Sequence, residues 1–349
     1  MKPDASAIRD DLDRLARSLG FALCRVAPAG IPPHADAFRQ WLAEGRAGEM
    51  AWLERNQERR TDPERVLPGV KSVIVLAMNY WQGPAPSLPP DEPRGKIARY
   101  AWNDDYHDLI EPKLRAVDER LQHYGGRQRF YVDTGPVLER DFAALAGAGW
   151  HGKSTMLIHP ELGTWFFLSE LFTTLELPPD APLPDRCGSC TRCINACPTG
   201  AITAPHQLDA RRCVSYLTIE LKGSIPEEFR PLIGDRIYGC DDCLAACPWN
   251  RFAQASHEAA FAARPAVSLT LRDYLAMDDE AFRTLFRRSP IKRIKRRGFL
   301  RNVCVALGNV GTPDDLPSLE RAAADPEPLI AEHARWAIKR IRERLGQHL

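Results

Sequence analysis

Residues 187–198 read Cys-Gly-Ser-Cys-Thr-Arg-Cys-Ile-Asn-Ala-Cys-Pro, and this stretch decides how the middle of the chain folds. Three cysteines follow one another at two-residue intervals, and the fourth comes after three residues, directly before a proline. A similar run at 240–248, Cys-Asp-Asp-Cys-Leu-Ala-Ala-Cys-Pro, has Cys213 as its expected fourth member. Two-residue intervals turn successive thiolates toward different irons of one cube. The double pattern is therefore typical of a bacterial ferredoxin-like module with two [4Fe–4S] clusters.

The last cysteine of each run is predicted to bind the other run's cluster. In two-cluster ferredoxins this cysteine crosses over, and the fixed φ of the following proline stops the chain from wrapping further around the first cube. One cube is accordingly assigned to Cys187, Cys190, Cys193 and Cys247. The other cube is assigned to Cys197, Cys213, Cys240 and Cys243.

Two other uses of these cysteines fit the sequence less well. Structural zinc also favours C-x-x-C pairs, but four ligands satisfy it and a third cysteine at the same spacing has no use. A disulfide framework needs an oxidising compartment, whereas the chain begins Met-Lys-Pro-Asp and is acidic where a secretory signal is apolar. We therefore expect a reducing, cytoplasmic location. The remaining Cys24 and Cys304 have apolar neighbours and are expected in the core.

Length and charge limit the number of domains and the kinds of partner that the chain can have. A chain of 349 residues is too long for one compact core, so two or three domains are expected. The formal net charge of +1 means that the whole molecule carries no strong electrostatic field. The longest apolar stretch, residues 72–80, is far shorter than the roughly 20 residues of a membrane-spanning helix, and it predicts a buried strand.

The first region, residues 1–176, alternates segments of helical and strand periodicity. Helices are expected over 6–19, 109–121 and 138–146, and strands over 21–26, 73–77, 130–132 and 164–175. This alternation indicates an α/β or layered α+β domain large enough to enclose a cofactor. A stiff, proline-rich joint then leads into the ferredoxin-like module, predicted over 184–255.

The third region, residues 256–349, is predicted to be helical. From Ser289 onward, apolar residues recur at helical spacing on both sides of a break at 308–313, which is typical of HEAT-like helix pairs. So few repeats cannot stand alone, and the region is expected to dock onto the rest of the chain. Its first helix, Arg287 to Arg301, carries eight Lys or Arg and no acid. Such a run is often only a solvated face, but its concentration in a nearly neutral chain favours a nucleic-acid partner.

Residues 147–154 match the nucleotide-binding pattern G-x-x-x-x-G-K-[ST], but their context differs from that of a P-loop. A P-loop follows a buried strand and opens a helix, whereas residues 137–146 have helical periodicity. ATP hydrolysis is therefore not expected. The loop remains a candidate contact, through Lys153 and Ser154, for an anionic or amide-rich cofactor tail.

Motifs from all three regions together resemble one family, the epoxyqueuosine reductases. The ferredoxin motif alone is unspecific, but it occurs here beside several short runs with more distinctive residues. These runs are Val-Asp-Thr-Gly-Pro at 132–136, Trp-His-Gly-Lys-Ser at 150–154, Gly-Thr-Trp at 163–165, Tyr-Gly-Cys-Asp-Asp-Cys at 238–243 and Arg-Gly-Phe-Leu-Arg-Asn at 297–302. The resemblance extends over essentially the whole chain.

This resemblance implies a cobalamin-dependent oxidoreductase, related in its core to reductive dehalogenases. It implies reduction of the epoxide of epoxyqueuosine, at the wobble position of tRNA, to queuosine, the last step of queuosine biosynthesis. Electrons would pass through the two [4Fe–4S] clusters to cobalamin, starting from a small donor such as a flavodoxin or a ferredoxin. The expected partner is the tRNA anticodon stem-loop, and a monomer without membrane contact is expected.

Asp133 is the candidate general acid. The reaction takes two electrons and two protons and releases water, so the protein has to deliver a proton to the epoxide oxygen. Asp133 follows a predicted strand directly, and the resemblance implies that the family uses the matching aspartate. The alternative is a turn-forming aspartate that caps its own backbone.

Contacts to the corrin and to tRNA are expected from further residues. Around the corrin we place Arg60, Arg99, Tyr100, Asp133, Lys153, Ser154, Thr164, Tyr216 and Asp241. The cobalamin-binding pattern D-x-H-x-x-G has its closest match at residues 105–110, which lack the glycine, so His107 is not expected to bind cobalt. Contacts to tRNA are expected from Lys292, Arg293, Lys295, Arg296, Arg297 and Arg301.

Two other functions remain open on the sequence alone. One is a plain ferredoxin-type electron-transfer protein that binds no corrin, which an absorbance spectrum with cobalamin would reveal. The other is a cobalamin enzyme with the same core that acts on a small molecule, as a reductive dehalogenase does. The basic stretch argues against the second, because a small substrate needs no such surface.

Overall fold

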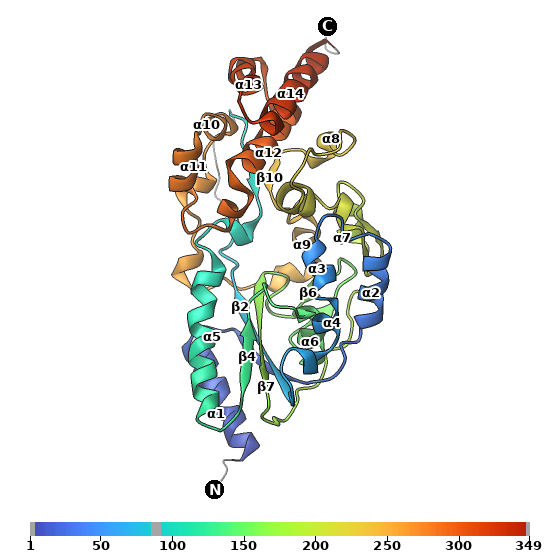
Figure 1. Ribbon diagram of the computed structural model, residues 1–349, viewed down its shortest axis with the longest axis vertical. Coiled ribbons are helices and arrows are strands. Elements are labelled where there is room, and N and C mark those ends of the chain that lie inside the picture. The colour runs from blue at the N-terminus through green and yellow to red at the C-terminus, as the bar shows by residue number, and fades with distance from the viewer. Residues whose placement is uncertain (1–3, 85–91, 347–349) are drawn as a thin grey trace.

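The computed structural model describes residues 4–84 and 92–346, and its first region is built on a four-stranded sheet in the order β1-β2-β7-β4 (Figure 1). The strands are β1 (Leu23–Pro28), β2 (Ser72–Asn79), β4 (Gln128–Tyr131) and β7 (Phe166–Thr173). Every neighbouring pair in this sheet is antiparallel. Of the two fold classes predicted for this region, the pairing is that of a layered α+β domain.

Helices cover both faces of this sheet (Figure 1). They are α1 (Ala5–Ser18) and α5 (Tyr106–Gln122) on one face and α6 (Glu139–Leu145) on the other. Successive strand residues point to opposite faces. Thus Ile74 of β2 packs toward α1 and α5, and its neighbour Val75 packs toward α6. A strand in a middle layer has to be apolar on both sides, which explains the uninterrupted apolar run predicted as a buried strand.

The helices and strands predicted for the first region are all present, with their ends moved by a few residues. Helix α5 begins at Tyr106, three residues before the predicted start at 109. Asp105 accounts for the difference, because its side chain accepts a hydrogen bond from the backbone N–H of His107 and so caps the helix.

Shorter elements complete the first region. They are α2 (Ala35–Ala43), α3 (Ala51–Arg55), α4 (Gln57–Thr61), η1 (Pro63–Arg65), β3 (Lys96–Ile97), η2 (Arg99–Ala101), β5 (Trp150–His151) and β6 (Leu157–Ile158). The glycine-rich residues 147–154 lie between α6 and the β5–β6 hairpin. A helix therefore precedes this loop and a strand follows it, the reverse of a P-loop, as predicted.

The cysteine-rich module consists of short helices, turns and small strands. Its elements are α7 (Arg192–Ala196), β8 (Ile202–Ala204), β9 (Gln207–Leu208), η3 (Ala210–Arg212), η4 (Tyr216–Glu220), α8 (Arg230–Ile233), β10 (Arg236–Tyr238), α9 (Asp242–Ala245) and η5 (Pro248–Phe252). Helices α7 and α9 each carry the three-residue step of one cysteine run, and they pack against each other. Strand β10 pairs with β3, which joins the module to the first region.

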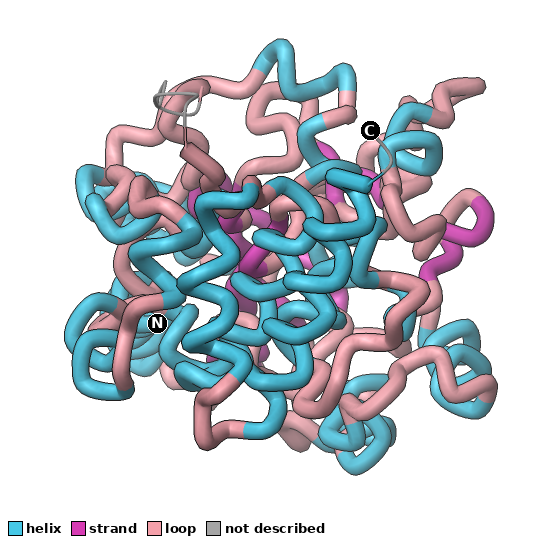
Figure 2. Tube along the Cα trace, turned by 90° about the horizontal axis from the view of Figure 1, so that it is seen from above, coloured by secondary structure: helices cyan, strands magenta, loops and turns pink. Residues whose placement is uncertain are grey.

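The third region is helical, as predicted, and lies at the opposite end of the molecule from the N-terminus (Figure 1). It contains η6 (Ala259–Phe261), η7 (Pro265–Val267), α10 (Leu271–Leu275), α11 (Asp279–Leu285), η8 (Pro290–Ile294), α12 (Lys295–Val310), η9 (Pro313–Asp315), α13 (Leu316–Ala323) and α14 (Pro328–Gly346). Seen from above, helices face the viewer and partly cover the strands behind them (Figure 2). The HEAT-like classification of these helices stays a prediction.

Helix α12 docks the third region onto the cysteine-rich module. Its residues from Gly298 to Gly308 are all buried, and it packs against α14, α8 and β10. The Asn302 side-chain amide donates hydrogen bonds to the backbone carbonyls of Thr218 and Ile237, at 2.8 and 2.9 Å. The expectation that this region docks onto the rest of the chain is confirmed.

The basic stretch from residue 287 to 301 does not form the single helix that we predicted. It is divided into η8 and α12, and Lys295 at their junction has a φ of 58°. Pro290 begins η8, because proline fits the first turn of a helix but cannot continue one that is already formed. Within the described residues, no helix is long and apolar enough to cross a membrane.

Candidate functional site

The structure places the thiol of Cys247 near the thiols of the first cysteine run. Burial raises the pKa of the Cys247 thiol to about 11. The neighbouring thiolates whose negative charges add to this effect are those of Cys187, Cys190 and Cys193. These four are the residues that the crossover pattern assigned to one cube.

The other four cysteines form a second group. Burial raises the pKa of the Cys243 thiol well above its usual range. The thiolates whose charges add to this effect are those of Cys197, Cys213 and Cys240. Buried thiols of this kind become stable thiolates when a bound metal supplies positive charge. The two groups therefore have the composition and surroundings that cluster binding needs, and ligation itself stays a prediction.

Lys153 holds the first cysteine loop. Its ammonium donates hydrogen bonds to the backbone carbonyls of Gly188, at 2.6 Å, and Cys190, at 3.1 Å. The glycine-rich loop of the first region is thereby tied to the cysteine-rich module. This position differs from the contact with a cofactor tail that the sequence suggested.

A cavity of about 580 Å³ lies between α2, α3, α6 and the β8–β9 hairpin. This volume falls in the range of roughly 300–1,000 Å³ that is usual for ligand sites. Apolar side chains such as Phe38, Trp41 and Met50 line part of the wall, and Arg60 and Asp133 contribute polar groups. The cavity can therefore hold a large ligand that is partly apolar and partly polar.

Asp133 stands at the edge of this cavity in a strained turn. Its φ is 58°, a left-handed conformation that costs an L-residue roughly 1–2 kcal/mol and that aspartate tolerates better than most. The Tyr106 hydroxyl donates a hydrogen bond of 2.6 Å to its Oδ2, and Nε2 of His107 lies 3.7 Å from the same oxygen. Burial and the charge of Asp133 raise the pKa of Tyr106 well above its usual range, so the phenol keeps its proton. Tyr106 thus orients the Asp133 carboxylate.

Arg60 supplies an unused donor beside this carboxylate. One of its terminal nitrogens donates to the backbone carbonyl of Val137 at 2.9 Å, while its buried Nε has no partner among the described residues. Burial lowers the pKa of Arg60, and the negative charges of Glu139 and Asp133 oppose this effect. A ligand with carbonyl or phosphate oxygens would satisfy the free donor.

Three of the predicted corrin contacts connect Asp133 with the cysteines. The backbone N–H of Arg99 donates to the Asp241 carboxylate at 2.7 Å, and Asp241 directly follows a predicted cluster ligand. The ring of Tyr100 lies 6.1 Å from the ring of Tyr106, which binds Asp133. Arg99, Tyr100 and Asp241 therefore lie between the proposed acid and one cysteine group.

The other three predicted corrin contacts are occupied by, or buried among, protein groups. The backbone N–H and hydroxyl of Thr164 both donate to the side-chain oxygen of Asn250, at 2.9 and 3.0 Å. The Tyr216 hydroxyl accepts a hydrogen bond from the backbone N–H of Glu49 at 2.9 Å. Ser154 is buried in the turn between β5 and β6. In this structure none of these three side chains lines the cavity.

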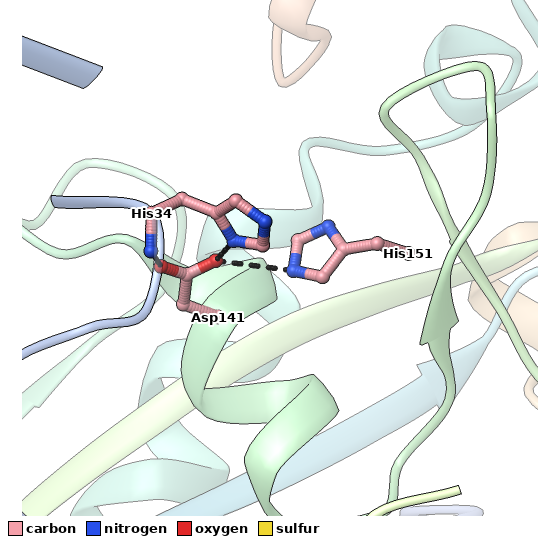
Figure 3. Close-up of side chains that lie close together, drawn as sticks. All are labelled: His34, Asp141 and His151. Atoms are coloured by element: carbon pink, nitrogen blue, oxygen red, sulfur yellow. Dashed lines mark hydrogen bonds and ion pairs between the residues drawn. The ribbon is translucent and has the colours of Figure 1, made fainter. Parts of the chain in front are cut away.

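A cluster of two histidines and an aspartate at the cavity wall was not predicted. His34 donates to Asp141 through its backbone N–H, at 2.9 Å, and its ring Nδ1 lies 2.7 Å from the same carboxylate. Nε2 of His151 approaches from another side, 3.1 Å from the carboxylate oxygen but outside hydrogen-bond geometry (Figure 3). Burial raises the pKa of Asp141, and the two histidines outweigh this effect, so the net pKa is lowered.

The donor atoms of this cluster lie within 4.8 Å of one another, and two imidazoles with a carboxylate are a set that divalent transition metals accept. The direct contact between His34 and Asp141 already satisfies both partners without an ion. The three residues of the cluster come from separate segments of the sequence, so no local pattern could have revealed the cluster.

Other residues near Asp133 were also missed. Tyr106 and His107 belong to the stretch that was considered only as a cobalt-binding pattern. Glu170 is a lone acid in the apolar segment predicted as a strand, and Glu139 begins the helix after the Asp133 turn. An acid in an otherwise apolar strand is a signal that the sequence offered.

Arg301 has to be removed from the predicted tRNA contacts. It is 1% exposed, and its guanidinium donates hydrogen bonds to the backbone carbonyls of Leu217, Leu221 and Gly223 at 2.7–2.8 Å. These bonds fasten α12 to the cysteine-rich module. The guanidinium is therefore bonded to carbonyl groups inside the protein and does not reach a phosphate.

The other basic residues of this stretch divide into two kinds. Arg296 forms an ion pair of 2.6 Å with Asp325 and is largely covered. Arg293 lies 3.1 Å from Asp105 but remains exposed over part of its length. Of the predicted tRNA contacts, those that stay exposed are Lys292, Arg293, Lys295 and Arg297.

Two family models match the chain. A model described as epoxyqueuosine reductase QueG, DUF1730, matches residues 60–134, which include Asp133. A model described as a 4Fe-4S double cluster binding domain matches residues 186–250, which include all eight cysteines of the two groups.

Curated relatives match along almost the full length. An epoxyqueuosine reductase from Xanthomonas campestris pv. campestris is 43% identical over 344 residues, which cover 97% of this chain and 97% of the relative. An epoxyqueuosine reductase from Escherichia coli K12 is 40% identical over 346 residues, covering 96% and 91% of the two chains.

Solved structures of the same kind of protein share the fold. A crystal structure of epoxyqueuosine reductase with a tRNA-Tyr epoxyqueuosine-modified stem loop superposes with a TM-score of 0.90 at 32% identity, covering 97% of this chain and 91% of that one. A Bacillus subtilis epoxyqueuosine reductase, with its aspartate catalytic loop swung out of the active site, gives a TM-score of 0.89 at 32% identity and the same coverage.

Proposed function

The chain belongs to the epoxyqueuosine reductase family, and from this premise we propose that it reduces the epoxide of epoxyqueuosine in tRNA to the alkene of queuosine. The observation that carries this function is the 43% identity to an epoxyqueuosine reductase over 97% of both chains. The protein is accordingly an oxidoreductase that acts on tRNA. Its reaction adds two electrons and two protons to the epoxide and releases one water.

We propose cobalamin as the cofactor, held in the cavity beside Asp133. Three features of the cavity support this: a volume of about 580 Å³, a wall that is partly apolar, and the unused donor of Arg60. A corrin ring with amide side chains has the matching combination of an apolar face and polar edges. When bound, cobalamin supplies the electrons that break the carbon–oxygen bonds.

The two cysteine groups are proposed to bind the two [4Fe–4S] clusters with crossed ligands. Arg99, Tyr100 and Asp241 lie between one group and the residues around Asp133, so this cluster is the one adjacent to the cavity. The other cluster, held in part by the loop that Lys153 binds, is proposed to receive electrons from a small donor protein.

Asp133 is proposed to deliver a proton to the epoxide oxygen. Its left-handed turn and the hydrogen bond from Tyr106 aim the carboxyl at the cavity. The aspartate catalytic loop of the Bacillus subtilis relative, which is swung out of the active site, supports an acid carried by a loop that can take more than one position. Arg60, which faces the same space, is proposed to hold a ligand oxygen with its free Nε.

The exposed cations of the third region are proposed to contact the anticodon stem. Lys292, Lys295 and Arg297 can neutralise phosphates, and such contacts position a nucleic acid without reading its sequence. The modified base has to leave its stack to enter a cavity inside the protein. A structure of a relative with a modified stem loop supports this mode of binding.

The function can be tested with tRNA from cells that lack this protein. Purified protein containing iron–sulfur clusters, supplied with cobalamin and a strong chemical reductant, should convert epoxyqueuosine into queuosine, as measured by nucleoside mass spectrometry. Asp133→Asn is the matched control for catalysis. Conversion without cobalamin would contradict the cofactor and leave the function intact. Failure to convert, with no spectral change on adding cobalamin, would favour the plain electron-transfer protein.

A further inference from the structure

Two carboxyl groups lie in contact beneath Asp133, where α6 crosses the sheet. Glu170 is on the central strand β7, opposite Val75 and Tyr131, and it is 0% exposed. Neither of its carboxyl oxygens has a hydrogen-bond partner among the described residues, apart from the neighbouring carboxyl of Glu139. A charged residue in the middle layer of a domain is rare unless it is paired, so this position needs a physical account.

Glu139 connects this buried acid with the cavity. It begins α6, lines the cavity, and one of its oxygens also has no partner in the described part of the chain. Its carboxyl contacts that of Glu170 on the inner side and lies beside the backbone N–H of Asp133 on the outer side. The three acids thus form a continuous row from the sheet interior to the cavity.

Two carboxylates in contact inside a protein cannot both be charged, because each disfavours ionisation of the other and burial disfavours both charges. Burial and the charge of Asp133 raise the pKa of Glu139 to about 7. Burial and the charge of Glu139 raise the pKa of Glu170 much further. The basic groups near Glu139 are Arg140 and Arg60, and those near Asp133 are His107, at 3.7 Å, and Arg293. Among the described residues, none of these forms an ion pair with either glutamate. The pair therefore carries at least one proton at neutral pH.

The reaction needs such a proton. Reduction of an epoxide to an alkene and water consumes two protons, whereas one carboxyl group such as that of Asp133 can deliver only one at a time. Tyr106, which touches Asp133, keeps its own proton because its pKa is raised. A second acid close to Asp133 is then required within one turnover.

We propose that Glu139 and Glu170 store the second proton and that Glu139 passes it to Asp133. The proposal rests on the proposed function. In this step Glu139 gives its proton to the Asp133 carboxylate while Glu170 keeps its own, so the two glutamates are never charged together. Asp133 passes this proton to the substrate oxygen, which already carries the first proton and departs as water. The pair then recovers a proton from solvent through the cavity that Glu139 lines. No electrons move in this relay, because they arrive separately.

The proposal can be tested by replacing each glutamate with glutamine, which keeps the size and hydrogen-bonding capacity but cannot release a proton. Rates of single turnovers on a modified stem loop are measured with reduced, cofactor-loaded enzyme between about pH 5.5 and 9. In the parent, Glu139 is protonated below its raised pKa and loses its proton as the pH rises, so the rate should fall above about pH 7. Glu139→Gln should be slowed about 10²-fold and lose this alkaline decline, with KM for tRNA unchanged.

A matched control is Glu161→Gln, because Glu161 is an exposed acid before the same strand and should keep the parental pH profile. Glu139→Gln and Glu170→Gln with the parent's rate and pH profile would overturn the proposal. If Glu170→Gln fails to fold, Glu139→Asp, which keeps a transferable proton, should restore most of the rate that Glu139→Gln loses.

A second measurement does not depend on turnover. Infrared spectra of resting protein at pH 8 should contain the C=O band of a protonated, buried carboxyl that shifts in deuterium oxide. Glu170→Gln should remove this band, and Glu161→Gln should not. A parent without such a band would overturn the proposal even if epoxyqueuosine is reduced. If the band is present but the protein does not reduce epoxyqueuosine, the proposed function is wrong and the protonated glutamate is not contradicted.

Discussion

The two cysteine groups and the cavity beside Asp133 hold their functional side chains in different ways. The cysteines are carried by tight loops and short helices, and each group needs only two or three segments close together. The cavity takes its polar groups from distant segments: Arg60 from α4, Asp133 from the turn after β4, and Glu139 from α6. A metal cluster can organise loops around itself, whereas the cavity depends on packing. Substitutions in the cysteine groups should therefore remove a cluster ligand. Substitutions around the cavity should instead displace a side chain or remove a proton that the reaction needs.

The largest effect should follow from Cys197→Ala. We expect the parent to contain about eight iron and eight sulfide per chain, because each cube holds four of each. The variant should lose the cluster that Cys213, Cys240 and Cys243 share, although Cys197 belongs to the other run. Iron and sulfide analysis should then give about half of the parental content, and turnover should be abolished.

The matched control for this substitution is Cys24→Ala, which removes a thiol outside both groups. Its iron content should equal that of the parent. A single cluster in the parent, zinc in place of iron, or loss of the first run's own cluster in Cys197→Ala would contradict the crossed ligands.

Asp133→Asn should have the next largest effect. The amide keeps the size of the side chain and the contact with Tyr106 but cannot deliver a proton, so turnover should fall about 10²–10⁴-fold. Absorbance spectra and iron analysis should show both clusters and bound cobalamin. Activity within threefold of the parent would instead make Asp133 a turn-forming residue. Tyr106→Phe, which only removes the orienting hydroxyl, should reduce turnover less.

A smaller and different effect is expected on the surface of the third region. Changing Lys292, Lys295 and Arg297 together to Gln should raise KM for tRNA and leave turnover at saturation nearly unchanged. Each lost phosphate contact should reduce the slope of log affinity against log salt by roughly 0.7–0.9. Binding measured at several salt concentrations tests this directly.

Arg301→Gln is the contrasting substitution in the same stretch. Because its guanidinium bonds to backbone carbonyls inside the protein, its loss should lower the free energy of unfolding by roughly 1–3 kcal/mol. Any protein that remains folded should keep the parental salt slope. For the exposed cations, the contradicting result is that the variant with Lys292, Lys295 and Arg297 changed to Gln binds tRNA as tightly as the parent at low salt. These three side chains would then only be solvated and would not contact tRNA.

The smallest effect concerns the cluster of His34, Asp141 and His151. The pKa of Asp141 is lowered in the folded protein, so its carboxylate stabilises the fold above the unfolded pKa of about 3.9. This contribution is lost as the pH falls through the folded pKa. Asp141→Asn should therefore lower the free energy of unfolding at pH 7, by roughly 1–2 kcal/mol, and the difference from the parent should shrink in acid. Denaturant unfolding at pH 7 and pH 3 measures both values.

Local patterns in the sequence were sufficient to predict the helices and strands of the first region and the double 4Fe-4S module, while the ligand sets of its two clusters stay a prediction. Cysteine spacing acts over a few residues, and the periodicity of apolar residues reports which side of a helix or strand is covered. Both signals are local, because the backbone repeats every 3.6 residues in a helix and every two in a strand. Asp133 was proposed as the general acid because its run, Val-Asp-Thr-Gly-Pro, follows a predicted strand and resembles that of the family.

Only the tertiary structure decided which charged side chains are buried, which are exposed and which contact one another. Arg301 and Lys292 belong to one basic stretch, yet Arg301 is buried on backbone carbonyls and Lys292 remains exposed. The pKa of Glu139 and that of Glu170 are raised because both carboxyls are buried and two neighbouring segments of the fold bring them together in the interior. Burial and charge pairing depend on neighbours that the fold supplies from anywhere in the chain, and these neighbours determine whether a side chain is a ligand, an acid or part of the core.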